Sequence, residues 1–124
     1  MLTVEEVARH YALNPDTVRR HIRRGELDAV RLNRSYRIDW PAVWSCEEGP
    51  APRGRAVARY QVPLLTKKDL AAALRVSPRT VERWVETGLP TRNVFGRVRI
   101  NPHDAADWLS ATFGEDFSAA DLMR

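Results

Sequence analysis

Arginine side chains gather in one short stretch of the sequence, residues 14–25. Arginine is always charged, and its planar fork of N–H donors can bind two phosphate oxygens or a guanine edge at once. Lysine is a compact point charge without this fork, and the basic residues of the chain are almost all arginine. The stretch therefore favours contact with nucleic acid. Its basic side chains are those of Arg19, Arg20, Arg23 and Arg24, with His21 among them.

Local signals predict that this stretch is a helix. Asn14 can accept hydrogen bonds from the free amides of a first turn, and Pro15 stands at the first helical position, where no donor is lost. Gly25 can adopt the left-handed conformation that ends a helix. Residues 77–88 repeat the order of small polar cap, proline and terminal glycine. The sequence thus predicts two equivalent helices.

Helical spacing divides the side chains of residues 14–25 between two faces. Val18 and Ile22 recur at the spacing of an inward face, with His21 beside them. Because His21 matches Trp84 in the second stretch, we interpret it as a core or interface side chain. The outward side chains form the first candidate DNA-binding set: Asp16, Thr17, Arg19, Arg20, Arg23 and Arg24.

Residue types suited to catalysis or metal binding lack the spacing that such chemistry needs. His10, His21 and His103 form no metal-ligand pattern, and no glycine-rich phosphate loop occurs. Cys46 is the only cysteine, and no histidine lies near it in the sequence to activate it. We therefore expect no enzyme activity, no cofactor, no metal and no internal disulfide.

The overall composition agrees with a DNA-binding protein. The net charge is +4 over 124 residues, and 44% of the residues are hydrophobic, which suits small packed domains. No apolar run approaches the roughly 20 residues of a membrane-spanning helix, and the first residues lack the order of a signal peptide. We expect a cytoplasmic, nucleoid-associated protein that binds double-stranded DNA and no membrane.

A further helix is predicted ahead of the arginine helix. Thr3 and Glu6 have the spacing of a capping box, in which each side chain accepts from the other residue's amide. Leu2 can pack onto Val7 across the helix start, and an apolar stripe continues to Tyr11. Two short helices joined by a turn are therefore expected.

Residues 29–38 alternate in the manner of a two-stranded hairpin, which would form a wing beside the two helices. The alternation predicts Leu32, Tyr36 and Ile38 on the inward face. Arg34 and Arg37 fall on the outward face and join the candidate DNA-binding residues. A short helix with two tryptophans follows and would complete the small core.

The same order of elements then repeats, so that Asn14 corresponds to Ser77 and Ile38 to Ile100. We predict a mostly α-helical protein with short β-hairpin wings, built as two tandem winged helix-turn-helix domains. The expected divisions are a first domain at 1–46, a basic linker at 47–62, a second domain at 63–114 and a tail at 115–124 with a possible short helix. In the second domain the candidate DNA-binding residues are Arg79, Thr80, Glu82 and Arg83 on the helix, and Arg97 and Arg99 on the wing.

The predicted linker contains a smaller candidate site. Pro52-Arg53-Gly54-Arg55 resembles the core of an AT-hook, an extended segment that lays arginines in a narrow minor groove. Arg53 and Arg55 are the candidate residues, and an ordinary solvated linker is the alternative. A flexible linker of 18 residues would typically span roughly 21–26 Å. Half-sites on one face of DNA lie about 34 Å apart, and an extended linker could bridge them, so a monomer could suffice.

These motifs resemble the excisionase-type winged helix-turn-helix family, relatives of the MerR regulators. The resemblance rests on residues 2–8, 14–18, 24–27 and 37–39, and on the repeated motifs at 65–66, 77–81, 87–90 and 99–101. It implies a second helix in the major groove and a wing in the adjacent minor groove. It also implies a recombination directionality factor acting with an integrase or, alternatively, a transcription regulator acting with RNA polymerase. The joining of two copies in one chain departs from the usual form of the family.

The two copies differ in charge. Where the first helix has Arg19, Arg23 and Arg24, the second has Glu82, Glu86 and Thr87. We predict that the first unit supplies most of the DNA affinity. Glu82 could accept a hydrogen bond from a cytosine amino group, in which case the second unit reads a different half-site. Alternatively, the second unit turns this face to a protein and acts as an adaptor.

Overall fold

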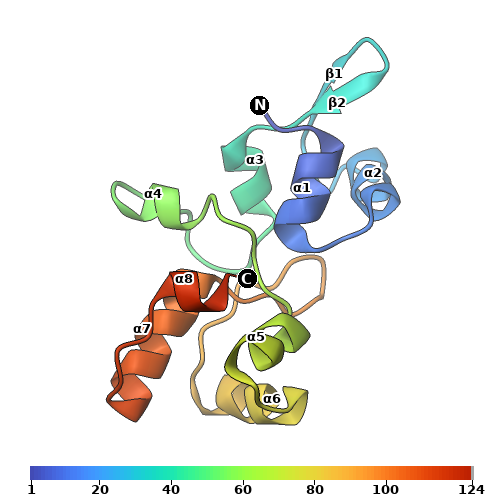
Figure 1. Ribbon diagram of the computed structural model, residues 1–124. Coiled ribbons are helices and arrows are strands. Elements are labelled where there is room, and N and C mark those ends of the chain that lie inside the picture. The colour runs from blue at the N-terminus through green and yellow to red at the C-terminus, as the bar shows by residue number, and fades with distance from the viewer. Residues whose placement is uncertain (124) are drawn as a thin grey trace. The chain divides into compact units, whose positions relative to one another are not determined.

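The computed structural model describes residues 1–123 and divides into two compact units (Figure 1). The first unit comprises Met1–Pro63, and the second begins at Leu64. Each unit has a core of its own. Among the described residues, no helix is long and apolar enough to cross a membrane.

The first unit begins with two short helices joined by a turn. Thr3 caps the first helix: its hydroxyl accepts from the Glu6 amide at 3.1 Å, and the Glu6 carboxylate accepts from the Thr3 amide at 3.0 Å, as predicted. Ala12 ends this helix in the left-handed conformation, with φ of 52°. Asn14 caps the next helix by accepting from the Asp16 amide at 2.8 Å. The elements of the unit are α1 (Val4–Tyr11), α2 (Pro15–Arg23), β1 (Val30–Leu32), β2 (Ser35–Arg37), α3 (Trp40–Ser45) and α4 (Ala56–Arg59).

The hairpin of β1 and β2 is joined to the rest of the unit at its base. Leu2 and Ile38 exchange two backbone hydrogen bonds of 2.6 and 2.9 Å, which pairs the residue before the Thr3 cap with the residue after β2. Ile38 is fully buried, as the alternation predicted. The prediction for Leu32 is wrong, because its side chain is 51% exposed. The hairpin extends beyond the helices of the first unit in Figure 1, and within residues 1–123 the side chain of Leu32 is left uncovered.

Residues predicted as a linker pack on the first unit instead of running free. Glu47 is buried, and its carboxylate accepts a hydrogen bond from the Tyr11 hydroxyl at 2.8 Å. Near the end of the predicted linker, Tyr60 follows the short helix α4, and its carbonyl accepts a hydrogen bond from the Trp44 indole N–H at 3.0 Å. The hydrogen bond from Tyr11 offsets part of the cost of burying the Glu47 carboxylate. The reach expected of a flexible linker therefore does not apply.

The second unit repeats the local geometry of the first. Thr66 and Asp69 form a capping box, and Arg75 ends the helix in the left-handed conformation with φ of 56°. Leu65 and Ile100 exchange backbone hydrogen bonds of 2.7 and 2.8 Å, at the positions that match Leu2 and Ile38. The elements are α5 (Lys67–Leu74), α6 (Pro78–Thr87), α7 (Pro102–Phe113) and α8 (Ala119–Leu122).

The second hairpin is a tight turn without a continuous strand. Val94 and Arg97 exchange two backbone hydrogen bonds of 2.9 Å around Phe95 and Gly96, which have φ of 51° and 78°. Positive φ at both central residues is the turn geometry that matches the twist of paired strands. The second wing is therefore shorter than the first.

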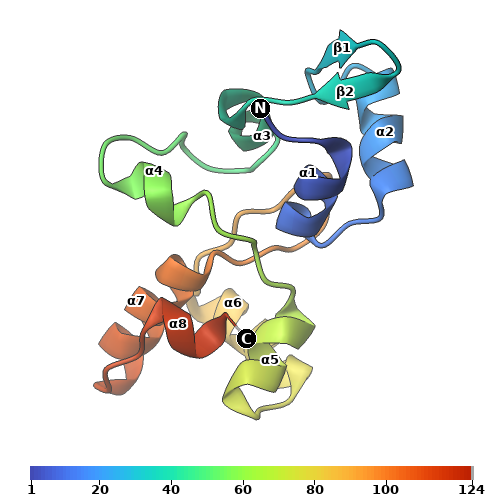
Figure 2. The same cartoon turned by 45° about the horizontal axis from the view of Figure 1, so that its top comes forward.

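The C-terminal segment belongs to the core of the second unit. Ser118 and Asp121 form a capping box at the start of α8, and Leu122 is 1% exposed. This helix packs against α5 and α7, beside which it lies in Figure 2. Of the predicted tail, Arg124 lies outside the described residues.

The burial of Leu122 predicts that α8 stabilises the second unit. Leu122→Ala should lower the free energy of opening of α7, measured by amide hydrogen exchange, by about 2–5 kcal/mol because it leaves a cavity. Met123→Ala is the control, since Met123 is 42% exposed, and it should change this free energy by less than about 0.5 kcal/mol. Equal effects of the two substitutions would contradict the packing of α8.

His10 is buried in the first unit as a neutral side chain. It is 3% exposed, and its ring lies 4.9 Å from the ring of Trp40 in an edge-on arrangement. Burial lowers the pKa of His10 from its usual 6.5 to about 4. Between these two pKa values the unfolded chain carries a proton on this ring, whereas the folded chain does not.

The first unit should lose stability as the pH falls from 6.5 towards 4. The unfolded state binds the proton throughout this range and the folded state does not, so the loss approaches about 3 kcal/mol. His10→Phe keeps a flat ring and should abolish this component. The measurement is the difference between wild-type and variant unfolding free energies at each pH, which cancels the carboxylates they share. A constant difference would show that His10 does not titrate as proposed.

Candidate nucleic-acid interface

The outward face of α2 presents three exposed arginines. Arg20, Arg23 and Arg24 border an open depression of about 400 Å³, together with Asp16. The inward prediction is confirmed for Val18, which is fully buried. The surface is thus a row of guanidinium groups carried by a short, capped helix.

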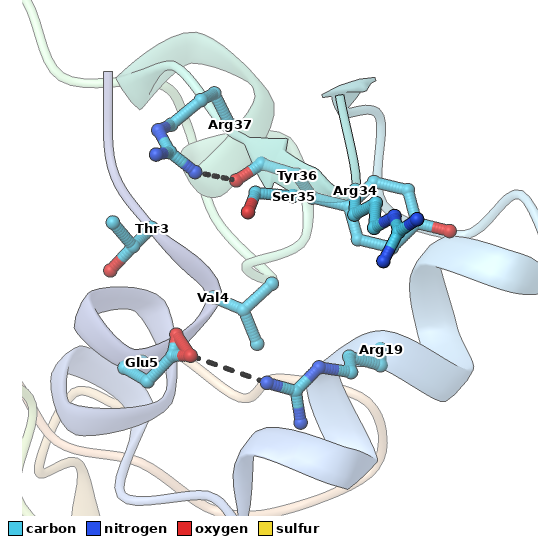
Figure 3. Close-up of a pocket in the computed structure, with 8 residues that line it drawn as sticks. All are labelled: Thr3, Val4, Glu5, Arg19, Arg34, Ser35, Tyr36 and Arg37. Atoms are coloured by element: carbon cyan, nitrogen blue, oxygen red, sulfur yellow. Dashed lines mark hydrogen bonds and ion pairs between the residues drawn. The ribbon is translucent and has the colours of Figure 1, made fainter. Parts of the chain in front are cut away.

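A groove separates α2 from the hairpin. It has a volume of about 450 Å³, and Figure 3 shows its lining from three directions: the start of α1, one side of α2 and strand β2. The Leu2–Ile38 backbone pairing sets the base of the hairpin beside the start of α1, which creates this groove. The lining residues are Thr3, Val4, Glu5, Arg19, Arg34, Ser35, Tyr36 and Arg37.

Arg19 is engaged within the first unit. Its guanidinium lies 3.2 Å from the Glu5 carboxylate of α1 (Figure 3) and also 2.9 Å from the Asp16 carboxylate of α2. Its side chain is 37% exposed. The sequence placed Arg19 and Asp16 with the outward residues but did not reveal that they pair. Arg19 therefore contributes less free positive charge than its neighbours on α2.

The hairpin supplies the other wall of the groove. Arg34 is exposed at the turn, whereas Arg37 is half-buried and donates to the Tyr36 carbonyl at 2.8 Å. The alternation of residues predicts Tyr36 on the inward face. Instead Tyr36 lines the groove, and the guanidinium of Arg31 lies 5.9 Å from the centre of its ring. An arginine and an aromatic residue opposite each other in register are the signal that could have identified this pair.

The second unit has a groove at the matching place. Its volume is about 460 Å³, and its walls come from the start of α5, from α6 and from the second hairpin. Two lysines line it, and no pattern in the sequence indicates them as part of a site. The lining residues are Thr66, Lys67, Lys68, Pro78, Glu82, Arg97, Val98 and Arg99.

The charge of Glu82 is compensated within the second unit. The Lys67 ammonium lies 3.4 Å from its carboxylate, and this pair joins α5 to α6 as Glu5 and Arg19 join α1 to α2. From the sequence alone, Arg19 and Glu82 are expected to be free charges of opposite sign. The structure shows that each has a partner on the preceding helix, so the two outward surfaces differ less than the sequence suggested.

The other candidates of the second unit divide into exposed and buried residues. Arg79, Arg83 and Arg97 are exposed, and Thr80 is half-buried with its hydroxyl 3.0 Å from that of Ser77. The outward placement of Arg99 is wrong. Arg99 is 8% exposed and donates to the Val98 carbonyl at 2.8 Å. Burial, reinforced by the positive charge of Arg97, lowers the pKa of Arg99.

The extended minor-groove segment is not formed at residues 53–55. The Arg53 and Gly54 carbonyls accept from the amides of Ala56 and Val57 at 3.0 and 3.2 Å, which turns the chain into α4. Arg55 has the helical φ of −66° and stands as the cap of this helix. Arg53 and Arg55 are exposed, but the chain around them is a turn rather than the extended path that a narrow groove needs.

The histidines take structural positions in the described chain. His21 is 8% exposed, and its Nδ1 lies 3.1 Å from the Glu26 carboxylate, at the end of α2. Within residues 1–123, no group of three or more histidine, cysteine, aspartate or glutamate side chains could hold a metal ion.

The first unit can be compared with known proteins through its α1, α2 and hairpin. Residues 1–39 match a family model described as a helix-turn-helix domain. Neither the curated proteins nor the solved structures contain a match to the chain. The matched range extends from the first residue to Asp39, the cap of α3, and so contains α1, α2 and the hairpin. Residues 1–39 are therefore similar to a helix-turn-helix domain, and DNA binding is the activity that this similarity suggests.

Proposed function

We propose that the chain is a sequence-specific binder of double-stranded DNA, with α2 in the major groove and the first hairpin in the adjacent minor groove. The observation that carries this proposal is the exposed row of Arg20, Arg23 and Arg24 beside a groove whose other wall holds Arg34. A B-DNA major groove admits one α-helix, and guanidinium groups suit both its guanine edges and the flanking phosphates. The activity proposed is binding, without catalysis or a cofactor.

We further propose that the second unit is a winged helix-turn-helix domain as well. Its support is geometric: Thr66, Arg75 and Ser77 repeat the cap, the left-handed turn and the second cap of the first unit. The Leu65–Ile100 pairing repeats the join between the hairpin and the first helix. Two such units in one chain would bind a direct or imperfect repeat with unequal halves, and a single chain could do what a dimer usually does.

The biological role we propose is that of an excisionase, a recombination directionality factor acting at an attachment site with an integrase. This rests on the resemblance of residues 2–8, 14–18 and 24–27 to that family. A promoter-binding regulator would use the same surfaces. Footprinting on the DNA that flanks the gene, with and without a neighbouring recombinase, distinguishes the two: protection of an attachment site supports the excisionase role, and protection of a promoter replaces it with the regulator.

The two proposed reading helices remain unequal after the ion pairs are taken into account. Arg23 of α2 and Arg24, the cap that follows it, match Glu86 and Thr87 of α6. The first unit therefore has two positive charges where the second has one negative charge. All four residues are exposed. Phosphate contacts by basic side chains supply a large share of DNA affinity, so α2 should contribute more than α6.

Arg20→Ala should therefore weaken DNA binding more than Arg83→Ala. These arginines occupy matching positions and are both exposed, so each serves as the control for the other. Loss of a guanine contact would cost about 1–3 kcal/mol, or roughly 5- to 150-fold in Kd, for Arg20, and less for Arg83. The measurement is fluorescence anisotropy with a labelled duplex that carries the footprinted site.

Salt dependence supplies a second criterion for this prediction. The affinity of the wild-type chain should fall steeply with salt concentration, because each phosphate contact releases condensed counterions. If Arg83→Ala weakened binding as much as Arg20→Ala, the inequality of the units would be wrong. A flat salt response of the wild-type chain would contradict DNA binding itself.

A further inference from the structure

The only two lysines of the sequence stand side by side at the start of α5. Lys67 and Lys68 are the first two residues of this helix, and both line the groove of the second unit. All other basic residues of the chain are arginines. At the matching positions of α1, the first unit has Val4 and Glu5. The second unit thus has a lysine, Lys68, where the first unit has a glutamate, Glu5, at the second position of the helix.

Folding alone does not favour lysines at this position. The N-terminus of a helix carries a partial positive charge from its free N–H groups, so carboxylates stabilise it and ammonium groups destabilise it. Glu5 at the start of α1 obeys this rule, and Lys68 at the start of α5 breaks it. The pair with Glu82 relieves part of the cost for Lys67, while Lys68 is exposed beside it. A side chain that is unfavourable where it stands suggests a role in binding.

The opposite wall of the groove carries positive charge as well. Arg97 is exposed on the second hairpin, and Thr66 contributes a hydroxyl close to the lysines. The groove thus presents cations from two elements, with Glu82 as the one carboxylate among its lining residues. Its shape and sign match a polyanionic strand better than they match a protein surface, because interface cores are depleted of lysine.

We propose that this groove binds one sugar-phosphate strand of a DNA duplex, with Lys67 and Lys68 of α5 on one side and Arg97 of the hairpin on the other. The proposal rests on the proposed function and assigns its second unit a distinct mode of contact. In the first unit the start of the first helix carries no cation, because Val4 and Glu5 stand there. In the second unit Lys67 and Lys68 of α5 and Arg97 of the hairpin add cations to the exposed Arg79 and Arg83 of α6. The second unit therefore holds the DNA backbone through α5 as well as through α6.

Lys68→Glu in the full chain tests the proposal, because it places at this position the residue that the first unit already has there. The probe is a labelled duplex of mixed sequence, long enough for two half-sites, titrated at about 50–200 mM KCl. The affinity should fall about tenfold, and the slope of log affinity against log salt should become less steep by about one. The thermal midpoint should rise by about 1–8 °C, because glutamate suits a helix start.

Arg55→Glu is the matched control, since it changes the charge by the same amount at the start of α4 and outside both grooves. It should alter the Kd less than threefold, an order-of-magnitude bound for the general effect of net charge. A gain in thermal midpoint together with a loss of affinity supports the proposal, because a purely structural role would move both downward. Lys68→Gln removes the positive charge without adding a negative one. It should also lower the affinity and raise the thermal midpoint, but by less than Lys68→Glu.

Two outcomes would overturn the inference while leaving the proposed function in place. In one, Arg20→Ala weakens DNA binding, but Lys68→Glu changes the Kd no more than the Arg55→Glu control does. In the other, Lys68→Glu and Lys68→Gln lower the thermal midpoint and the affinity together, which would make Lys68 structural. If the wild-type chain fails to bind any duplex, the proposed function fails, and the inference fails with it.

Discussion

A pair of backbone hydrogen bonds controls the architecture of both units. Leu2 pairs with Ile38, and Leu65 pairs with Ile100, so in each unit the residue before the first helical cap is joined to the residue after the hairpin. These bonds set the base of a hairpin beside the start of a helix. Without them the hairpin would be an exposed two-stranded ribbon, which is marginally stable at best in water. Each groove depends on this pairing, because it fixes the hairpin wall beside the start of the first helix of the unit.

Ion pairs across the helices act on this scaffold without creating it. Glu5 and Arg19 connect α1 with α2, while Lys67 and Glu82 connect α5 with α6 with the charges exchanged. Partly exposed pairs of this kind are worth about 0–1 kcal/mol, much less than the burial of core side chains such as Val18. Their main effect is to determine which charges remain free at the surface.

Local features of the fold could be predicted from the sequence, and long-range ones could not. The cap at Thr3 depends on neighbouring residues alone, and the burial of Val18 follows from helical spacing. The prediction that Leu32 is buried failed because alternation shows which side chains share a face of the hairpin, but not whether another element covers that face. Glu47 accepts a hydrogen bond from Tyr11, which lies 36 positions earlier, and no local sequence pattern indicates such a partner. The candidate arginines of α2 were found by composition, whereas the pairing of Arg19 needed the structure.

The start of α5 differs in charge from the start of α1, although the two helices begin in the same way. Both units satisfy the same local rules at their caps and turns, so a departure at one matching position stands out against its copy. Lys68 departs from the rule that Glu5 follows, although the two helices begin with the same capping-box geometry. Each unit thus serves as a reference for the other: the residues at which their caps and turns agree hold the local geometry, and Lys68 lies where this geometry is equal but the charge is not.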